Sequence, residues 1–325
     1  MSIVVFGSLN MDLVTCTDRL PHPGETLMGQ QFFTTPGGKG ANQAVAAAKL
    51  GVPTVLIGRV GNDGFGTELL TGLRSQQIQI DDIGIDSSTH TGVAIINVAD
   101  NGENQIIGVA GANGRLDESD IAKLQVHLPR TKLLLLQLEV NLSAIRLAIQ
   151  TAHQAGIPII LDPAPVPTEA IADLYPLVDI LVPNEVEAGQ LVGFPVQDVQ
   201  TAAQAAQRLR SQGAKTIVIK LGAQGAYCLP NPGLPGPGLP ERGEAFFVPA
   251  FRVEAIDTVA AGDAFAGGLA VALVEGRSLP EAIRWGCAAG ALATTQVGAQ
   301  VAMSDRSTFN QFLTQHAKID PSNPN

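Results

Sequence analysis

Hydrophobic residues along the chain gather in short continuous runs, which alternate with alanine-rich stretches where apolar residues recur with the period of a helix. Continuous apolar runs are typical of strands buried on both faces, as in a parallel sheet between two layers of helices. The pattern therefore predicts an α/β fold. Strands are predicted at residues 3–9, 55–60, 133–138, 158–161, 178–182 and 216–220, and helices at 40–50, 65–75, 144–155 and 199–212.

Two segments, residues 10–35 and 91–109, instead alternate polar and apolar positions. Such alternation is typical of antiparallel strands with one face in contact with solvent. The sequence Asp100-Asn101-Gly102 in the second segment predicts a hairpin with a type I′ turn. The two segments form either one small sheet, which would cover the end of the α/β domain as a lid, or two independent hairpins.

These patterns also predict how the chain is divided. A segment rich in Pro and Gly is expected to be a surface loop inserted in the main domain, because neither helix nor sheet accommodates that composition. The main α/β domain is predicted to comprise residues 1–9, 36–90 and 110–310, the lid residues 10–35 and 91–109, the inserted loop residues 230–243, and a C-terminal tail residues 311–325.

Composition narrows the possible classes of function. The chain has 325 residues, of which 45% are hydrophobic, so we expect a large buried core and exclude extensive disorder. Its formal net charge of −10 argues against general electrostatic binding to nucleic acid or to anionic membranes. Any phosphate group that the protein handles must therefore be bound by local groups.

The spacing of cysteines and histidines gives no support for a zinc or haem site, because the three cysteines form no C-x-x-C pair and the five histidines are scattered. The N-terminal residues lack the basic region of a signal peptide. The longest apolar helical stretch, residues 264–274, is shorter than the ~20 residues of a membrane span. We therefore expect a cytoplasmic protein.

The most informative motif is residues 257–268, a turn of small residues that leads directly into a helix. The backbone amides of Ala260, Ala261 and Gly262 are available to an anion at that helix N-terminus. Asp263 follows in the first turn, where it is placed to accept a proton from a hydroxyl that attacks a bound phosphoryl group. The alternative is that Asp263 only caps the helix.

A glycine-rich loop, residues 36–42, precedes the helix at 40–50. Its glycines allow close approach of the backbone to a ligand, and Lys39 and Asn42 supply hydrogen-bond donors. The loop does not match the Walker A pattern, and the chain contains no G-x-G-x-x-G dinucleotide motif. A plain helix start is the alternative.

Polar residues also follow two of the predicted strands: Asn10 and Asp12 follow the first, and Glu139 follows the strand at 133–138. Ligands of open α/β sheets bind beyond the carboxyl ends of the strands. Together these side chains are suited to binding the hydroxyl groups of a polyol, although each alone is more often a turn residue.

A third strand end carries Asn184 and Glu187, which lie three residues apart at the start of a helix. This spacing suits a hydrated Mg²⁺ ion near phosphates, because magnesium retains water and takes few protein ligands. The same spacing is also that of an ordinary capping box.

Taken together, these segments resemble the PfkB family of carbohydrate kinases. The similarity runs in the expected order over nearly all of residues 1–303, and residues 257–263 are its most specific part. It implies a three-layer α/β/α domain with a mostly parallel sheet and a small β-sheet lid. The matching stretches are residues 7–12, 21–26, 37–44, 136–139, 162–165, 183–188 and 257–263.

The resemblance implies ATP-dependent phosphorylation of the 5-hydroxyl of D-ribose, with Asp263 as proton acceptor and the amides of Ala260, Ala261 and Gly262 as an anion hole. Alternatives in the same family are fructokinase, adenosine kinase and 2-keto-3-deoxygluconate kinase. A sugar-binding regulatory protein without activity is a different class, against which the Gly262-Asp263 pair argues. The implied sugar-binding residues are Asn10, Asp12, Gly38, Lys39, Asn42, Glu139 and Asp263.

The resemblance further implies binding sites for nucleotide and metal ions. Lys220 stands where the family often has Thr, and Cys287 where relatives often carry Asn or His. The implied nucleotide-binding residues are Asn184, Lys220, Leu221, Gly222, Ala223, Gln224, Gly225, Gly262 and Cys287. Mg²⁺ would be organised by Asn184 and Glu187, and an activating K⁺ or similar monovalent cation would lie at Asp257, Val259, Ala293, Gln296 and Gly298.

Two further expectations come from the same resemblance. Ala302 replaces a serine often found near the monovalent cation, which would weaken that site without abolishing it. The lid strands would form the contact of a homodimer, with Asp12 reaching the sugar from the edge of the lid.

Overall fold

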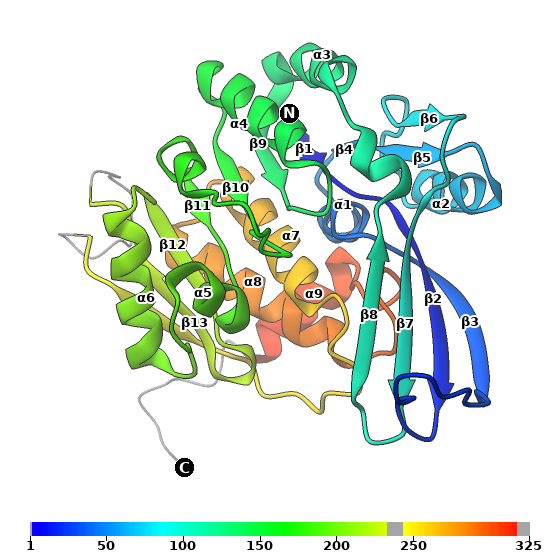
Figure 1. Cartoon of the computed structure of the whole chain (residues 1–325). Coiled ribbons are helices and arrows are strands. Elements are labelled where there is room, and N and C mark those ends of the chain that lie inside the picture. Colours follow the sequence, from blue (N-terminus) through cyan, green and yellow to red (C-terminus); the bar gives the residue numbers. More distant parts are fainter. Residues whose placement is uncertain (1, 233–242, 317–325) are drawn as a thin grey trace.

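The computed structural model of this chain describes residues 2–232 and 243–316 (Figure 1). Its main sheet has eight strands in the order β14-β13-β12-β11-β10-β9-β1-β4. Six are parallel, and β13 and β14 are antiparallel additions at one edge. The strands are β1 (Ser2–Phe6), β4 (Thr54–Ile57), β9 (Thr131–Leu136), β10 (Ile159–Leu161), β11 (Ile180–Leu181), β12 (Thr216–Lys220), β13 (Gly225–Leu229) and β14 (Phe246–Pro249).

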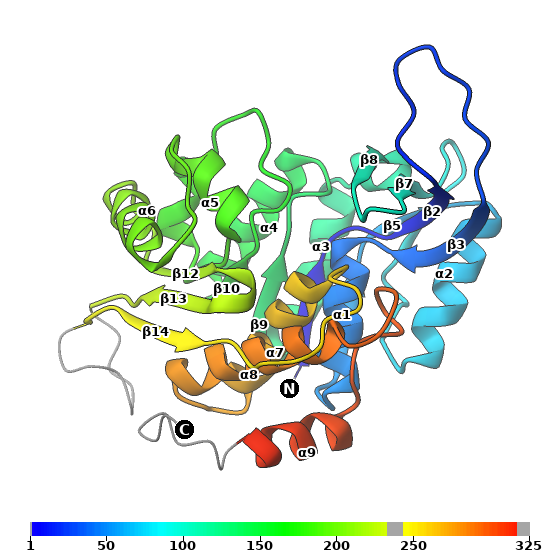
Figure 2. The ribbon, with the colours of Figure 1, turned by 90° about the horizontal axis from the view of Figure 1, so that it is seen from below.

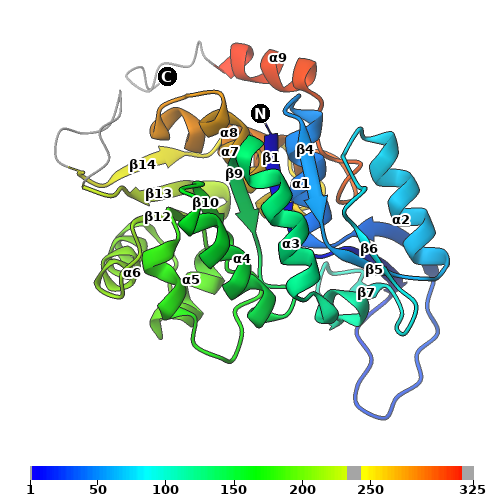
Figure 3. The ribbon, with the colours of Figure 1, turned by 90° about the horizontal axis from the view of Figure 1, so that it is seen from above.

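Helices cover both faces of this sheet, which gives the three-layer α/β/α arrangement (Figure 3). Alternate residues of β1 enter two separate cores: Ile3 and Val5 pack with α1, α7 and α8, whereas Val4 and Phe6 pack with α3 and α4. The helices are α1 (Lys39–Lys49), α2 (Gly64–Ser75), α3 (Glu118–His127), α4 (Leu142–Gln154), α5 (Glu185–Val192), α6 (Val199–Ser211), α7 (Ala261–Val274), α8 (Leu279–Ala293) and α9 (Arg306–His316). Short 3₁₀ turns occupy Gly111–Arg115, Leu128–Arg130, Ala172–Leu177 and Gly222–Gln224.

The two segments with alternating polarity form one four-stranded sheet beside the main sheet (Figure 1). Each segment is a hairpin, and the two are joined because β2 and β7 pair in parallel from Asn10 and Gly92 to Thr17 and Ala99. The alternative of two independent hairpins is therefore wrong. The strands of this sheet, which we call the lid sheet, are β3 (Gln31–Gly37), β2 (Asn10–Thr17), β7 (Gly92–Ala99) and β8 (Asn104–Val109).

The turn between β7 and β8 differs from the prediction. The amide of Gly102 donates to the carbonyl of Ala99 (2.9 Å), and the amide of Ala99 donates to the carbonyl of Glu103 (2.9 Å). Gly102 has φ +84°, whereas Asn101 does not adopt a positive φ. A type I′ turn requires a positive φ at both central residues, so the turn is a three-residue loop that ends in glycine.

The prediction of a single strand at 55–60 is also wrong. This segment contains parts of two strands, β4 and β5 (Arg59–Gly61), which belong to different sheets. The chain leaves the main sheet at Gly58, where a Cβ atom would come within 2.5 Å of the Gly7 carbonyl oxygen. β5 pairs instead with β6 (Gly84–Asp86). Gly58 and Arg59 interrupt the apolar run at this break, but Val60 and Gly61 of β5 are buried like the residues of β4.

The C-terminal part is more ordered than predicted, since α9 continues to His316 within the expected tail at 311–325. Phe312 and Leu313 of this helix pack against the core, and α9 lies along the outside of α8 (Figure 2). Residues 317–325, and residues 233–242 of the Pro- and Gly-rich loop, lie outside the described residues. None of the helices in the described ranges is long and apolar enough to cross a membrane.

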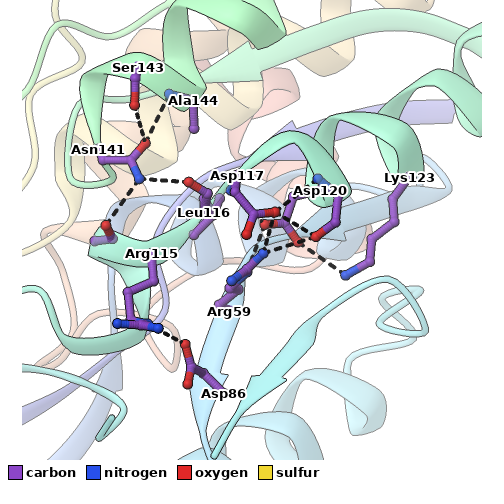
Figure 4. A network of polar contacts seen from close by, with 12 residues as sticks. Arg59, Asp86, Arg115, Leu116, Asp117, Asp120, Lys123, Asn141, Ser143 and Ala144 are labelled. Atoms are coloured by element: carbon purple, nitrogen blue, oxygen red, sulfur yellow. Dashed lines mark hydrogen bonds and ion pairs between the residues drawn. The ribbon is translucent and has the colours of Figure 1, made fainter. Parts of the chain in front are cut away.

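A cluster of ion pairs, which we call the scaffold cluster, joins β5 to α3 (Figure 4). The Arg59 guanidinium contacts Asp117 and Asp120, each at 2.7 Å, and Lys123 contacts Asp120 at 3.1 Å. Asp117 and Asp120 also form the capping box of α3. The cluster holds the N-terminal part of α3 against β5, which belongs to the small β5–β6 sheet. Arg59 and Asp120 are 61 residues apart in the sequence.

Candidate active site

Polar residues from three separate segments meet at the carboxyl edge of the main sheet. The Glu139 carboxylate, just beyond β9, accepts hydrogen bonds from the Ser8 hydroxyl (2.5 Å) and the Lys39 amide (2.9 Å). Its Oε2 also accepts a longer bond from Asn10 Nδ2 (3.4 Å). The structure thus brings together two of the predicted strand-end residues, Asn10 and Glu139.

Asp12 reaches this region from β2 of the lid sheet and is only 9% exposed. A Cβ atom on Gly37 of the neighbouring strand would lie 2.3 Å from an Asp12 carboxylate oxygen, so glycine is needed there. Burial, followed by the charges of Glu139 and Asp263, raises the pKa of Asp12 to about 7. The lid therefore contributes a carboxyl group to the site, and no cation among the described residues forms an ion pair with it.

The backbone of the glycine-rich loop packs directly on the end of β1. Gly38 has φ +87°, and a Cβ atom there would lie 2.6 Å from the Asn10 amide nitrogen. Gly40 packs as closely against the backbone, because a Cβ atom added there would lie 2.5 Å from the Ser8 amide nitrogen. Both positions require glycine because the loop packs closely on the backbone at the end of β1.

Lys39 provides positive charge between the carboxylates. Burial lowers the pKa of its ammonium group, but the neighbouring charges of Asp263, Asp162 and Glu139 outweigh burial and hold the pKa above its ordinary value. Lys39 therefore stays charged and partly offsets the repulsion among the acids.

Asp263 is the most enclosed carboxyl group of the site, 5% exposed and in the first turn of α7. It accepts hydrogen bonds from Asn42 Nδ2 (2.9 Å) and Gln43 Nε2 (3.0 Å), both on α1. It does not cap α7, whose N-cap is Ala260 without a side-chain bond. Burial raises the pKa of Asp263, while Lys39, Asn42 and Gln43 oppose the increase. The result is a fixed carboxylate with increased affinity for a proton, as a general base requires.

The predicted anion hole lies at the N-terminus of α7, where Ala260 adopts the left-handed conformation with φ +58°. The Ala261 amide donates to the carbonyl of Thr258 over 3.3 Å, so this amide must leave that bond in order to reach an anion. Gly262 faces Lys220, whose Nζ is 3.4 Å from the position of a Cβ on Gly262. The positive end of the helix and a lysine thus lie at the same place.

A cavity of about 530 Å³ opens beside this helix N-terminus. The residues that line it include six of those predicted for the nucleotide: Lys220, Gly222, Ala223, Gly225, Gly262 and Cys287. Two of the other predicted residues do not line it: the Leu221 side chain is buried, and Gln224 Nε2 donates to the carbonyl of Gln197. Burial raises the pKa of the Cys287 thiol to about 12, so this thiol is neutral. The sequence reasoning missed other lining residues, among them Phe251, Arg252 and Thr258.

Asn184 and Glu187 form a reciprocal capping box at α5. Glu187 Oε2 accepts from the Asn184 amide (2.8 Å), and Asn184 Oδ1 accepts from the Glu187 amide (2.8 Å). Burial and the charge of Asp162 raise the pKa of Glu187, against the effect of Lys220. In the described part of the chain, no three His, Cys, Asp or Glu side chains are grouped to hold a metal. These residues fit a hydrated ion bridged by phosphates, not a site made of protein ligands alone.

The loops predicted for a monovalent cation are joined by Asp257. Its carboxylate accepts from the amides of Val259 (2.9 Å) and Gly298 (2.8 Å), and its own amide donates to the carbonyl of Thr294 (3.2 Å). Ala293 ends α8 immediately before this contact, and Gln296 is exposed. Ala302, which follows Gly298 closely in the sequence, is buried.

Four polar residues of the site escaped the sequence reasoning: Ser8, Gln43, Gln137 and Asp162. Gln43 Nε2 bonds to both Asp263 and Asp162 (3.0 Å each), and Gln137 Nε2 bonds to Gln43 Oε1 (2.5 Å). All four lie inside stretches that carried the family resemblance, but only their long-range contacts show that they position the carboxylates.

A buried carboxylate at a helix N-terminus, with a cluster of polar side chains on one side and a cavity on the other, is typical of a kinase that acts on a small hydroxylated substrate. The chain belongs to the pfkB family of carbohydrate kinases, which it matches over residues 1–306.

Individual relatives make the comparison more specific. The chain is 39% identical to the ribokinase of Haemophilus influenzae, over 97% of this chain and 99% of that protein. It is 36% identical to a deoxyribokinase of Salmonella typhimurium, over 97% and 99% of the two chains. The structure of Arabidopsis thaliana ribokinase complexed with ribose and ATP superposes with a TM-score of 0.85 at 32% identity, covering 96% of this chain and 98% of the other.

Proposed function

We propose that this protein transfers a phosphoryl group from ATP to the 5-hydroxyl of D-ribose, giving D-ribose 5-phosphate and ADP. The observation that carries the proposal is Asp263, held by Asn42 and Gln43 between the sugar-side carboxylates and the cavity. The similarity to ribokinases over nearly the whole chain supports ribose as the acceptor.

In the proposed reaction, the sugar lies among Asn10, Asp12, Asn42 and Glu139, whose oxygen and nitrogen atoms are suited to its hydroxyl groups. The 5-hydroxyl points to Asp263, which accepts its proton while the oxygen attacks the terminal phosphorus atom. The new O–P bond forms as the bond to the leaving ADP oxygen breaks. The lid sheet excludes water from this step, which protects ATP from hydrolysis.

The nucleotide occupies the cavity beside α7, with its terminal phosphates toward Gly262 and its base between α8 and residues 250–255. Amides at the α7 N-terminus bind the negative charge of the phosphates. When bound, Mg²⁺ neutralises phosphate charge, and the Asn184–Glu187 pair fits its hydration shell.

A monovalent cation, K⁺ or a similar ion, is proposed as an activator at the loops that Asp257 joins. Val259 and Ala293 would contribute carbonyl oxygens, and these loops adjoin Ala260 at the start of the anion hole. Replacing KCl with choline chloride at the same ionic strength should lower turnover severalfold. Equal rates in the two salts would contradict activation.

A homodimer through the lid is also proposed, because the lid sheet exposes large apolar side chains on both faces: Phe32 (66% exposed) and Ile107 (59%) lie on one face, and Ile106 (60%) lies on the other. Burial of such residues is the main source of dimer stability. Light scattering should give twice the chain mass, and Ile106→Lys should give the monomer mass. A monomeric parent protein would exclude this dimer.

We also propose that the protein is cytoplasmic, because ATP is the proposed co-substrate and Cys16, Cys228 and Cys287 are free thiols. Recovery of the protein in the cytosolic fraction, with ATP-dependent activity, is the expected result. Recovery only with secreted or membrane material would contradict it.

The central test is release of ADP with a panel of acceptors: D-ribose, 2-deoxy-D-ribose, fructose, adenosine and 2-keto-3-deoxygluconate. We expect the highest kcat/KM with D-ribose. The similarity to a deoxyribokinase makes 2-deoxy-D-ribose the second candidate. Activity confined to fructose or adenosine would overturn the assignment, and inactivity toward every acceptor would favour a sugar-binding protein.

A further inference from the structure

Lys220 is a buried lysine whose side chain ends between the nucleotide cavity and the start of α7. It is the last residue of β12, is 8% exposed and lines the cavity. Its Nζ atom pairs with Asp162 Oδ1 at 2.9 Å. The same atom is 3.4 Å from the Cβ position of Gly262, one residue before the proposed base.

This location is electrostatically unfavourable for a lysine that has only a structural purpose. The helix N-terminus carries partial positive charge, so it repels an ammonium group. Asp162 provides one compensating carboxylate, which is also bonded to Gln43, and Glu187 is close enough for its charge to interact with that of Lys220. A lysine ammonium has three donors, and among the described residues Asp162 is the one acceptor bonded to it. An anion in the cavity would use the remaining donors.

We propose that Lys220 binds the transferred phosphoryl group of the nucleotide and stabilises the charge on its oxygens during transfer. The inference rests on the proposed kinase function and adds a catalytic side chain to it. Lys220 does not exchange a proton: the proton of the acceptor hydroxyl goes to Asp263, and the bridging oxygen leaves with ADP. Lys220 and the α7 N-terminus approach the same oxygens from adjacent sides.

The competing explanation is that Lys220 only neutralises the buried Asp162, which is 1% exposed. Removing Lys220 alone would leave that carboxylate unpaired and could unfold the protein. The comparison is therefore made in a background where the carboxylate is absent: Asp162→Asn against the double variant Asp162→Asn/Lys220→Met. Lys215→Met is the matched control, because Lys215 precedes the same strand and forms the same kind of pair with Asp179 (3.1 Å).

Calorimetry with a non-hydrolysable ATP analogue and with adenosine separates phosphate binding from base binding. Relative to Asp162→Asn, the double variant should bind the analogue about 10- to 100-fold more weakly, the usual range for a lost charge-assisted bond. Its affinity for adenosine should change less than about twofold, because adenosine carries no phosphate. Lys215→Met should bind both as the parent protein does.

Turnover provides the second measurement. The double variant should show a kcat at least tenfold below that of Asp162→Asn, and Asp162→Asn/Lys220→Arg should recover part of it because the charge is kept. Equal analogue affinity and equal kcat in Asp162→Asn and the double variant would overturn the proposal. If the parent protein phosphorylates no acceptor, the kinase assignment fails, yet the analogue and adenosine affinities still decide whether Lys220 binds phosphate.

Discussion

The active site and the scaffold cluster both bring acidic side chains close to basic ones, but the protein environment shifts their pKa values in opposite directions. In the active site, burial and like charge raise the pKa of Asp12 to about 7 and also raise that of Asp263. In the scaffold cluster, hydrogen bonds from Ser119 and Arg59 lower the pKa of Asp117 to about 2. In the scaffold cluster, the acidic groups are paired with basic side chains of the protein. In the proposed function, the acidic groups of the active site gain their full set of partners only when a ligand binds.

The difference follows from which partners surround each carboxylate. Asp120 is fully buried, yet Arg59 and Lys123 both contact it. Asp12 is buried to a similar degree, but its nearest charged neighbours are Glu139 and Asp263. In the proposed function, the free energy cost of such a site is recovered when sugar hydroxyl groups and phosphate-bound cations enter it. Substitutions in the two clusters should therefore affect activity and stability in different proportions.

The largest effect is expected for Asp263→Asn, which keeps the shape of the pocket but removes the proton acceptor. We expect kcat to fall by about 10³-fold, within the range for loss of a general base. Ribose affinity, measured by calorimetry, should stay within a few-fold of the parent value. Asp117→Asn in the scaffold cluster is the control and should leave kcat unchanged. Near-normal turnover of Asp263→Asn would refute its role.

The next largest effect is expected when Gly38, a backbone position of the site, is substituted. Gly38 and Gly51 have nearly the same φ, +87° and +88°, but only Gly38 has backbone atoms where a Cβ would lie. Gly51→Ala should cost about 1 to 2 kcal/mol of stability from strain alone. Gly38→Ala should cost at least about 3 kcal/mol and raise KM for ribose, because overpacking is added to strain. Equal unfolding free energies for the two variants would contradict this account.

In the scaffold cluster, Arg59→Met should lower stability without lowering activity. It leaves Asp120 buried with Lys123 as its remaining cation, and loss of a partner from a buried pair is costly. We expect a loss of about 2 to 3 kcal/mol in urea unfolding and a kcat within twofold of the parent. A tenfold fall in kcat in a folded variant would show that the two clusters are coupled.

Asp12→Asn should have the opposite effect on stability. The folded pKa of about 7 exceeds the ordinary value of 3.8, so the folded state binds a proton more tightly and ionisation destabilises it. At pH 8 the ligand-free variant should be more stable than the parent, by about 2 kcal/mol once neighbouring charges relax.

This stability difference should shrink as pH falls from about 7 to about 4, because both proteins then carry a neutral group at residue 12 when folded. Denaturant unfolding at pH 8, 6 and 4.5 measures it. A constant difference across this range would contradict the raised pKa, and so would a variant less stable than the parent at pH 8.

Much of the fold was predictable because the relevant signals are local. Continuous apolar runs identified the parallel strands, and β12 was placed at its observed bounds. The break at Gly58 and the loop at Gly102 were not predictable, because they depend on the packing of Gly7 and on the conformation of one residue. Helix α3 has a strongly polar sequence, so its apolar face gave a weak signal.

The site was predictable where a motif contains both the reactive group and its environment. Asp263 follows the turn that places it at a helix N-terminus, so its position could be derived from adjacent residues. Gln43 and Asp162 are separated from their partners by 220 and 58 residues, and no local pattern specifies such contacts. The capping box of Asn184 and Glu187 was correctly recognised as an alternative, and the structure contains it.

In the proposed function, the hydroxyl groups of ribose supply hydrogen bonds that the buried carboxylates of the active site lack in the free protein. The most direct test is calorimetric titration of ribose at pH 7 in buffers of different ionisation enthalpy, which counts the protons exchanged. Hydroxyl groups that donate to Asp12 favour its ionised form and lower its pKa from about 7, so binding should release a fraction of a proton. Asp12→Asn should abolish that release. Ribose binding without proton release, or with equal release in Asp12→Asn, would contradict the claim.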